Sequence, residues 1–137
     1  MTPENVARVL EAARAWLGTP YHHAANIKGV GVDCAMLPIE VFCGLGLVPR
    51  FDPRPYPHDW MLHRDDERYL GWVEQFAQRV DDAQPGDLAL YRVGRCLAHG
   101  GIVEIPETII HADLHAGRVE RGPLNWCNRL AGIWRIP

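Results

Sequence analysis

Cys34 is the residue of this sequence best placed to act as a nucleophile. It follows two glycines, Gly29 and Gly31, and an acidic residue, Asp33, and it precedes an apolar run. The side chain of an aspartate can accept hydrogen bonds from the free amides of a helix's first turn. The sequence therefore predicts a helix capped by Asp33, with Cys34 in its first turn, running to about Phe42. Free amides and the helix dipole at that end stabilise a thiolate.

Two histidines are placed to serve such a thiol. His99 opens a predicted strand over 98–105, and His111 closes the next predicted strand, over 108–112. In a hairpin the start of one strand lies near the end of the other, so the two imidazoles are expected to be neighbours. A cysteine nucleophile needs one imidazole to take its proton and a further polar group to orient that imidazole. Cys34, His99 and His111 thus form a candidate triad, in which a thiolate–imidazolium pair attacks a carbonyl.

These residue types also have purely structural interpretations. A free cysteine is usually a small buried hydrophobe, and His99 could equally be a core histidine with His111 at the surface. The other three cysteines, Cys43, Cys96 and Cys127, are expected in the core. The spacing from His111 to His115 lacks the glutamate of H-E-x-x-H, so neither a metal site nor another cofactor is expected.

The elements that must position the triad divide into helices first and strands second. Apolar spacing predicts helices over 4–17 and 65–80 in addition to the one after Asp33. Residues 21–32 are expected to form a loop, and residues 48–63, which carry five prolines, an irregular surface loop. Short β-patterns separated by turn residues follow, over 87–93, 98–105, 108–112, 118–121 and 130–136. The sequence predicts an α+β fold in one domain over 1–137, with N-terminal helices packed on a C-terminal antiparallel sheet of about five strands.

Pro38 conflicts with a regular helix that begins at Cys34. Inside a helix, proline removes one hydrogen bond and clashes with the carbonyl four residues earlier. The helix is therefore expected either to kink at Pro38 or to become regular only from that residue.

Charge and hydropathy exclude several classes of function. The net charge is −3 and the cations are scattered singly, which argues against nucleic-acid binding. No apolar run approaches the roughly 20 residues that span a bilayer, so no membrane insertion is expected. The first residues, Met-Thr-Pro-Glu-Asn, lack the cationic and apolar regions of a secretory signal. Synthesis in the cytoplasm without a signal peptide is expected.

Five motifs occur in an order that resembles one known family. They are Leu-Gly-Thr-Pro-Tyr at 17–21, Asp-Cys at 33–34, Gln-Pro-Gly-Asp-Leu at 84–88, His-Gly-Gly-Ile-Val at 99–103 and Ile-His-Ala at 110–112. This set resembles the NlpC/P60 cysteine peptidases, a papain-like group that cleaves bacterial cell-wall peptides. The resemblance spans nearly the whole chain.

The resemblance implies a role for each residue of the site. Cys34 would be the nucleophile, His99 the base and His111 the orienting residue, and the Tyr21 hydroxyl would lie near the thiol and help the oxyanion site. The bond implied is the amide between the side-chain carboxyl of D-glutamate and a diamino acid such as meso-diaminopimelate. Substrate contacts are expected from His22, His23 and Asp33, with Asn26, Trp60 and Trp72 as further candidates for the lining of the pocket.

Within the family, the chain is most similar to the stand-alone peptidases encoded with phage tails and gene-transfer agents. The residues that carry this similarity are Pro-Tyr-His-His at 20–23 and the segment 28–34. Peptidoglycan stem peptides and phage tail proteins are the partners implied, with a location in the virion.

Two departures from the family pattern leave alternatives open. Ala35 and Met36 replace the usual Ser-Gly, and Pro38 follows in the next turn. One alternative is an amidase or acyltransferase on the same Cys-His scaffold. The other is a catalytically inactive tail-assembly component.

Overall fold

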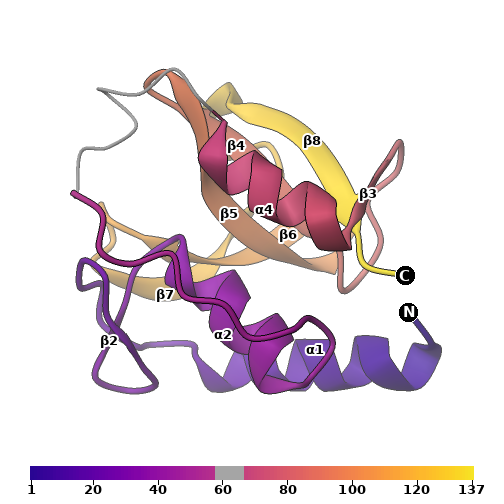
Figure 1. The fold of residues 1–137 in the computed structure, drawn as a ribbon, viewed down its shortest axis with the longest axis horizontal. Helices are drawn as coiled ribbons and strands as arrows, with labels where there is room; N and C mark the ends of the chain where they lie inside the picture. The colour runs from indigo at the N-terminus through magenta and orange to yellow at the C-terminus, as the bar shows by residue number, and fades with distance from the viewer. Residues whose placement is uncertain (58–66) are drawn as a thin grey trace.

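Helices precede strands along the chain, and most of the strands pair into one antiparallel sheet (Figure 1). The computed structural model describes residues 1–57 and 67–137. Its helices are α1 (Pro3–Ala15), α2 (Met36–Gly44), α4 (Arg68–Phe76) and the 3-10 turn η1 (Trp126–Asn128). Its strands are β1 (Asn26–Ile27), β2 (Gly31–Val32), β3 (Gln78–Val80), β4 (Leu88–Val93), β5 (Cys96–Ile105), β6 (Thr108–Asp113), β7 (Arg118–Pro123) and β8 (Leu130–Arg135). The predicted α+β fold is confirmed.

The main sheet has six strands where about five were expected, in the order β3-β8-β4-β5-β6-β7. The additional strand, β3, lies inside the range 65–80 that was predicted as helix. The helix ends at Phe76, and Ala77 is already extended, with φ −137° and ψ 154°. Residues Gln78–Val80 then pair with β8. Backbone pairing at the sheet edge has overridden the helical spacing of the apolar residues here.

Two predicted segments extend beyond the described residues. These are the second part of the irregular loop over 48–63 and the start of the helix over 65–80, because residues 58–66 are not described. Trp60, a candidate for the pocket lining, lies there as well. The predicted loop over 21–32 contains a short antiparallel pair, β1 with β2, in which Ile27 faces Gly31.

Helix α1 begins as its sequence predicts. The Thr2 hydroxyl accepts a hydrogen bond from the Asn5 amide at 3.1 Å, and Pro3 occupies the first helical position. The helix ends at Ala15, two residues before the predicted end. Val9 and Ala13, four residues apart on one face, are fully buried.

Helix α2 resolves the conflict over Pro38. The helix begins at Met36, so Pro38 lies in its first turn, and the helix is not restricted to the residues after the proline. Amides of the first turn have no partner within a helix, so the missing N–H of Pro38 costs little. Cys34 and Ala35 form a turn before the helix, which corrects the expectation that Cys34 lies in its first turn.

The helices lie in two groups around the sheet (Figure 1). Buried side chains of α1 and α2 form one core with residues of β5, β6 and β7, among them Ile102, Ile110 and Val119. Helix α4 packs across β4, β5 and β8, where Tyr69 joins Leu88, Leu90 and Trp134. No helix in the described ranges has both the length and the apolar character needed to cross a membrane.

Strand β5, which carries His99, is also linked to α1 and β7 by ion pairs of Glu104. Glu104 is 7% exposed, and its carboxylate accepts hydrogen bonds from Arg14 of α1 at 2.6 Å and from Arg121 of β7 at 2.7 and 3.0 Å. These bonds, those from Arg121 foremost, hold the pKa of Glu104 at about 2. The carboxylate is ionised at neutral pH and links the helical layer to the strand that bears His99.

Candidate active site

Asp33 organises the turn that presents Cys34. Its Oδ1 accepts hydrogen bonds from the amides of Ala35 at 3.2 Å and Met36 at 2.9 Å. Its Oδ2 accepts hydrogen bonds from the Ala24 amide at 2.8 Å and the Tyr56 hydroxyl at 2.6 Å. The N-cap of α2 is Ala35, with no side-chain cap, so the predicted cap at Asp33 is wrong by two residues. Asp33 instead binds the amides of the turn that leads into α2, and it joins the 21–26 segment and the proline-rich segment to that turn.

The Cys34 thiol lies against β5, beside the residue that precedes His99. It donates a hydrogen bond to the Ala98 carbonyl, with Sγ 3.5 Å from the oxygen. The Tyr21 hydroxyl donates to the same sulfur at 3.7 Å. Tyr21 thus lies near the thiol, where the sequence resemblance places it. The segment after α1 therefore brings the Tyr21 side chain next to the candidate nucleophile.

The two histidines form a hydrogen-bonded pair across neighbouring strands. Nε2 of His99 on β5 lies 2.8 Å from Nδ1 of His111 on β6, and both side chains are buried. The indole of Trp126 stacks on the His99 ring, with centroids 4.3 Å apart and an angle of 23° between the planes. The Tyr91 ring packs against His99 from β4, at 5.6 Å. The His99 ring is therefore fixed by one hydrogen bond and two aromatic contacts.

The environment keeps this group of residues neutral. Burial, followed by the negative charge of Asp33, raises the pKa of the Cys34 thiol to about 12. Burial, followed by the neighbouring His111, lowers the pKa of His99 to about 3, and burial also lowers the pKa of His111. Both shifts disfavour the expected thiolate–imidazolium pair and favour a thiol and a neutral imidazole. The amides near Cys34 do not outweigh its burial.

The hydrogen bond between the histidines restricts how His99 could act as a base. If Nε2 of His99 carries the hydrogen and donates to Nδ1 of His111, the Nδ1 atom of His99 has a free lone pair. A neutral His111 then carries its own proton on Nε2. That tautomer is the one in which His99 can accept a proton from a thiol.

The three residues predicted to contact substrate lie around the turn, with different degrees of exposure. Asp33 is 2% exposed and already holds groups of the protein itself. His23 has its Nε2 2.8 Å from the Tyr56 carbonyl oxygen and its Nδ1 3.8 Å from Asp33 Oδ2. His22 is exposed, with Nδ1 3.2 Å from the His23 carbonyl oxygen. Substrate binding by these residues stays a prediction. Asn26, a further candidate, donates to Glu40 at 3.2 Å.

Sequence reasoning missed three contributors to the site. Trp126 belongs to η1, a turn in which Cys127 and Asn128 have φ of 52° and 55°. Cys127 is exposed, so its expected place in the core is wrong. Tyr56 was missed because its role depends on its hydrogen bond to Asp33 across the fold. Gly122 was missed because it lies against His111, where an added Cβ would come within 2.7 Å of Nε2. A tryptophan between two asparagines in a turn was the one local signal that could have drawn attention to Trp126.

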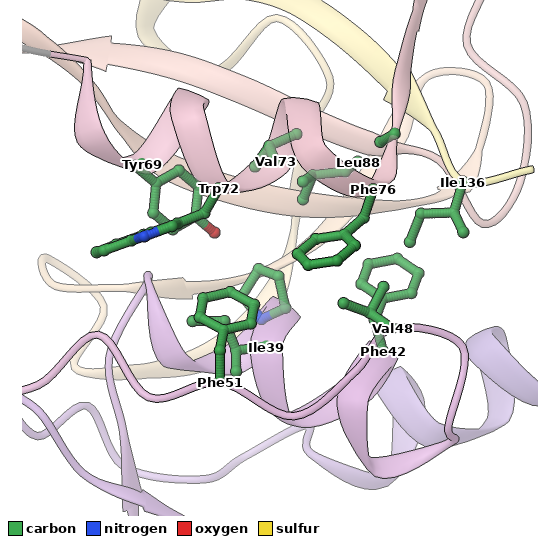
Figure 2. Close-up of a pocket in the computed structure, with 12 residues that line it drawn as sticks. Ile39, Phe42, Val48, Phe51, Tyr69, Trp72, Val73, Phe76, Leu88 and Ile136 are labelled. Carbon is green, nitrogen blue, oxygen red and sulfur yellow. The ribbon is translucent and has the colours of Figure 1, made fainter.

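Two pockets adjoin the site, and they share Tyr69 and Trp72 of α4. The larger, of about 440 Å³, lies between α2 and α4. Figure 2 shows its aromatic residues Tyr69, Trp72 and Phe76 on α4, facing Phe51 and side chains of α2. The second, of about 410 Å³, has Ala35 in its lining, directly after Cys34. Its other lining residues are Pro53, Pro55, Tyr56, Pro57, Arg68, Tyr69 and Trp72.

Comparisons with known proteins identify the fold. No family model and no curated protein matches the sequence. The structure is similar to the NlpC/p60 domain of the peptidoglycan hydrolase SagA, with a TM-score of 0.63, 20% identity, and coverage of 97% of this chain and 98% of that one. It is also similar to the peptidoglycan hydrolase RipB from Mycobacterium tuberculosis, with a TM-score of 0.66, 22% identity, and coverage of 100% and 69%.

A third similar structure is larger than this chain. It is a lipoprotein-like NLP/P60 protein from Staphylococcus aureus, with a TM-score of 0.69 and 20% identity. The match covers 99% of this chain but 42% of the staphylococcal protein. The three similarities show that the chain has the NlpC/P60 fold.

Proposed function

We propose that this protein is a cysteine peptidase that cleaves an amide bond in the stem peptides of peptidoglycan. The observation that carries the proposal is the hydrogen bond from the Cys34 thiol to the Ala98 carbonyl on β5, since the next residue, His99, is itself hydrogen-bonded to His111. Two proteins with the same fold, SagA and RipB, are described as peptidoglycan hydrolases, which supports this choice of substrate.

The neutral state of the site determines the order of the proposed chemical steps. The Cys34 sulfur attacks the carbonyl carbon of the scissile amide while its proton passes to Nδ1 of His99. The C–N bond breaks as His99 returns this proton to the leaving amine, and the acyl group stays on Cys34 as a thioester. A water molecule then gives a proton to His99 while its oxygen bonds to the thioester carbon. The C–S bond breaks, the acyl group leaves as a carboxylic acid, and His99 returns the proton to the Cys34 sulfur. His111 holds the His99 ring, and Tyr21 donates a hydrogen bond near the reacting sulfur.

The finer features of the proposal rest on the sequence motifs. The bond proposed is the one between the side-chain carboxyl of D-glutamate and a diamino acid, and the place proposed is a phage tail in the virion. The five motifs that resemble the NlpC/P60 family support the bond, and Pro-Tyr-His-His at 20–23 with the segment 28–34 supports the place. A tail protein would then bring the domain to the cell wall.

Digestion of purified sacculi tests the proposed activity. The released muropeptides are separated and their masses measured, and new amino termini identify the bond that is cut. Wild-type protein is expected to release fragments cut after D-glutamate, and Cys34→Ala is expected to release none. Cys127→Ala, which removes an exposed thiol, is the matched control and should retain activity. A folded wild-type protein that releases nothing would overturn the proposal.

Two observations favour the alternative functions. The apolar lining of the pocket between α2 and α4 suits an amidase or acyltransferase that binds an apolar acyl group, and the same thioester chemistry would serve it. The raised pKa of Cys34 and the presence of Ala35 after it suit an inactive tail-assembly component. Transfer of an acyl group to an added amine, without cleavage of sacculi, would favour the first. Absence of any covalent intermediate would favour the second.

A further inference from the structure

Tyr69 lies between the nucleophile turn and the base strand, although it is distant from both in sequence. It is 3% exposed and packs in one cluster with Ala35, the residue after Cys34. A methyl group built on Gly100, the residue after His99, would lie 3.1 Å from the Tyr69 hydroxyl oxygen. The hydroxyl therefore lies close over the backbone of β5, next to the candidate base.

The Tyr69 hydroxyl has no hydrogen-bond partner within residues 1–57 and 67–137. The other tyrosines near the site differ. Tyr21 donates to Cys34 Sγ at 3.7 Å, Tyr56 to Asp33 Oδ2 at 2.6 Å and Tyr91 to the Leu124 carbonyl at 2.7 Å. Most polar groups of buried side chains are paired. The Tyr69 oxygen is not among the fully buried atoms that lack a partner, so an accessible, unpaired hydroxyl on a buried side chain calls for an explanation.

The pockets around Tyr69 supply that explanation. Tyr69 lines both of them, and the larger one is otherwise lined by apolar side chains (Figure 2). In the smaller one, the prolines offer no backbone N–H, and the Tyr56 hydroxyl is already bonded to Asp33. The other donors of the smaller pocket are the Arg68 guanidinium, which lies over the Trp72 ring at 5.6 Å, and the Trp72 indole N–H. A mostly apolar pocket with a few polar groups beside a nucleophile is typical of a site that orients a ligand, and Tyr69 is the polar group that both pockets share.

We propose that the Tyr69 hydroxyl is a substrate-binding group that donates a hydrogen bond to a carbonyl or carboxylate oxygen of the acyl part of the substrate. The atoms beside that oxygen would contact the apolar walls formed by Pro55 and Trp72. This inference rests on the proposed function, because it assumes that Cys34 attacks a carbonyl. It assigns to α4 a share in positioning the substrate, in addition to the contribution of Tyr21 from the loop.

Tyr69→Phe separates this role from a structural one. The variant removes only the hydroxyl, which has no partner to lose, so the melting temperature Tm should stay the same or rise. Its kcat/KM on a purified muropeptide should fall about five- to tenfold, mainly through a higher KM, because one uncharged hydrogen bond to bound substrate contributes about that factor. Tyr91→Phe is the stability control. Its hydroxyl is bonded to Leu124, so its Tm should fall.

Two results would overturn the assignment of Tyr69 while leaving the proposed function intact. The first is an unchanged kcat/KM in Tyr69→Phe. The second is a loss of activity accompanied by a fall in Tm like that of Tyr91→Phe, which would indicate a structural role. Wild-type protein that cleaves no muropeptide would instead overturn the proposed function, and the role of Tyr69 with it.

Discussion

Nε2 of His99 lies 2.8 Å from Nδ1 of His111, and this contact decides which nitrogen of His99 can take a proton. Only Nδ1 of His99 is left to serve a nucleophile. The stacked ring of Trp126 closes one side of the same imidazole. The position of His111 therefore matters for the site, and Gly122 of β7 lies against its imidazole.

Gly122→Ala is expected to disturb the histidine pair. A Cβ atom at Gly122 would lie 2.7 Å from His111 Nε2, so the imidazole must move. A displacement of about 1 Å can cost about a hundredfold in rate, and the clash should cost about 1–3 kcal/mol of stability. Steady-state kinetics and urea denaturation measure both effects.

Gly71→Ala is the matched control for that substitution. Gly71 lies inside α4, and a methyl group there meets nothing within 4 Å. Alanine should stabilise the helix by about 0.5–1 kcal/mol without loss of activity. A Gly122→Ala protein as active as Gly71→Ala would contradict the role assigned to His111.

Trp126→Ala should raise the pKa of His99 from about 3 toward its ordinary value, because burial is the main cause of the lowered pKa. The imidazole also loses its stacking partner, so activity should fall about tenfold or more. An NMR titration of the His99 ring measures the pKa. Trp126→Phe keeps an aromatic face over the ring and should restore much of both properties. An unchanged titration in Trp126→Ala would show that the indole does not shield His99.

Several of these relationships were predictable from the sequence and others were not. The helix–strand order and the proximity of His99 to His111 follow from local spacing and hairpin geometry. Strand β3 was missed because its edge pairing with β8 is a long-range interaction that overrides helical spacing. The neutral state of Cys34 was missed because burial depends on the packing of the whole fold. Trp126 and Tyr69 reach the site from η1 and α4, and sequence patterns do not show such tertiary contacts.

The buried histidines should make stability depend on pH between about 5 and 6.5. The folded-state pKa of His99 is about 3, below the ordinary histidine value of 6.5, so in this range the unfolded chain takes up a proton that the folded protein does not. The free energy of unfolding should therefore be highest above pH 6.5 and should decrease as the pH falls, by up to about 1.4 kcal/mol per pH unit for one group. His111 contributes in the same direction.

Urea denaturation at several pH values measures that slope. His99→Gln should reduce it, whereas His115→Gln, which replaces an exposed histidine, should leave it unchanged. Equal slopes in the wild type and in His99→Gln would contradict the buried, neutral state of His99. The lowest pH of the series should be near 5. Below the ordinary glutamate pKa of 4.5, the paired carboxylate of Glu104 also makes the free energy of unfolding depend on pH.

Asp33→Asn should lower the pKa of Cys34, because the Asp33 charge is, after burial, the main cause that raises it. The rate of alkylation by iodoacetamide, followed by mass spectrometry of the peptide that contains Cys34, measures this pKa. The wild-type midpoint should lie above the ordinary value of about 8.5, and that of Asp33→Asn should be lower. The variant should also lose about 1–3 kcal/mol, because an amide nitrogen cannot accept the hydrogen bonds from Ala24 and Tyr56.

Asp52→Asn is the control for the charge effect. Asp52 belongs to the proline-rich segment that also contains Tyr56. Its carboxylate is bonded to Arg54 rather than to groups around Cys34. The Asp52→Asn substitution should leave the pH midpoint of Cys34 alkylation unchanged. A midpoint that does not move in Asp33→Asn would mean that burial alone sets the pKa of Cys34.

The most direct test of the central claim, that Cys34 forms a thioester with the acyl part of a stem peptide, is to trap that thioester. Wild-type protein is mixed with a purified muropeptide, quenched in acid within a single turnover, digested and analysed by mass spectrometry. The account predicts an added acyl mass on the peptide that contains Cys34, and no adduct with His99→Ala. Release of cleaved muropeptide at the wild-type rate by Cys34→Ala, with no adduct in either protein, would contradict it.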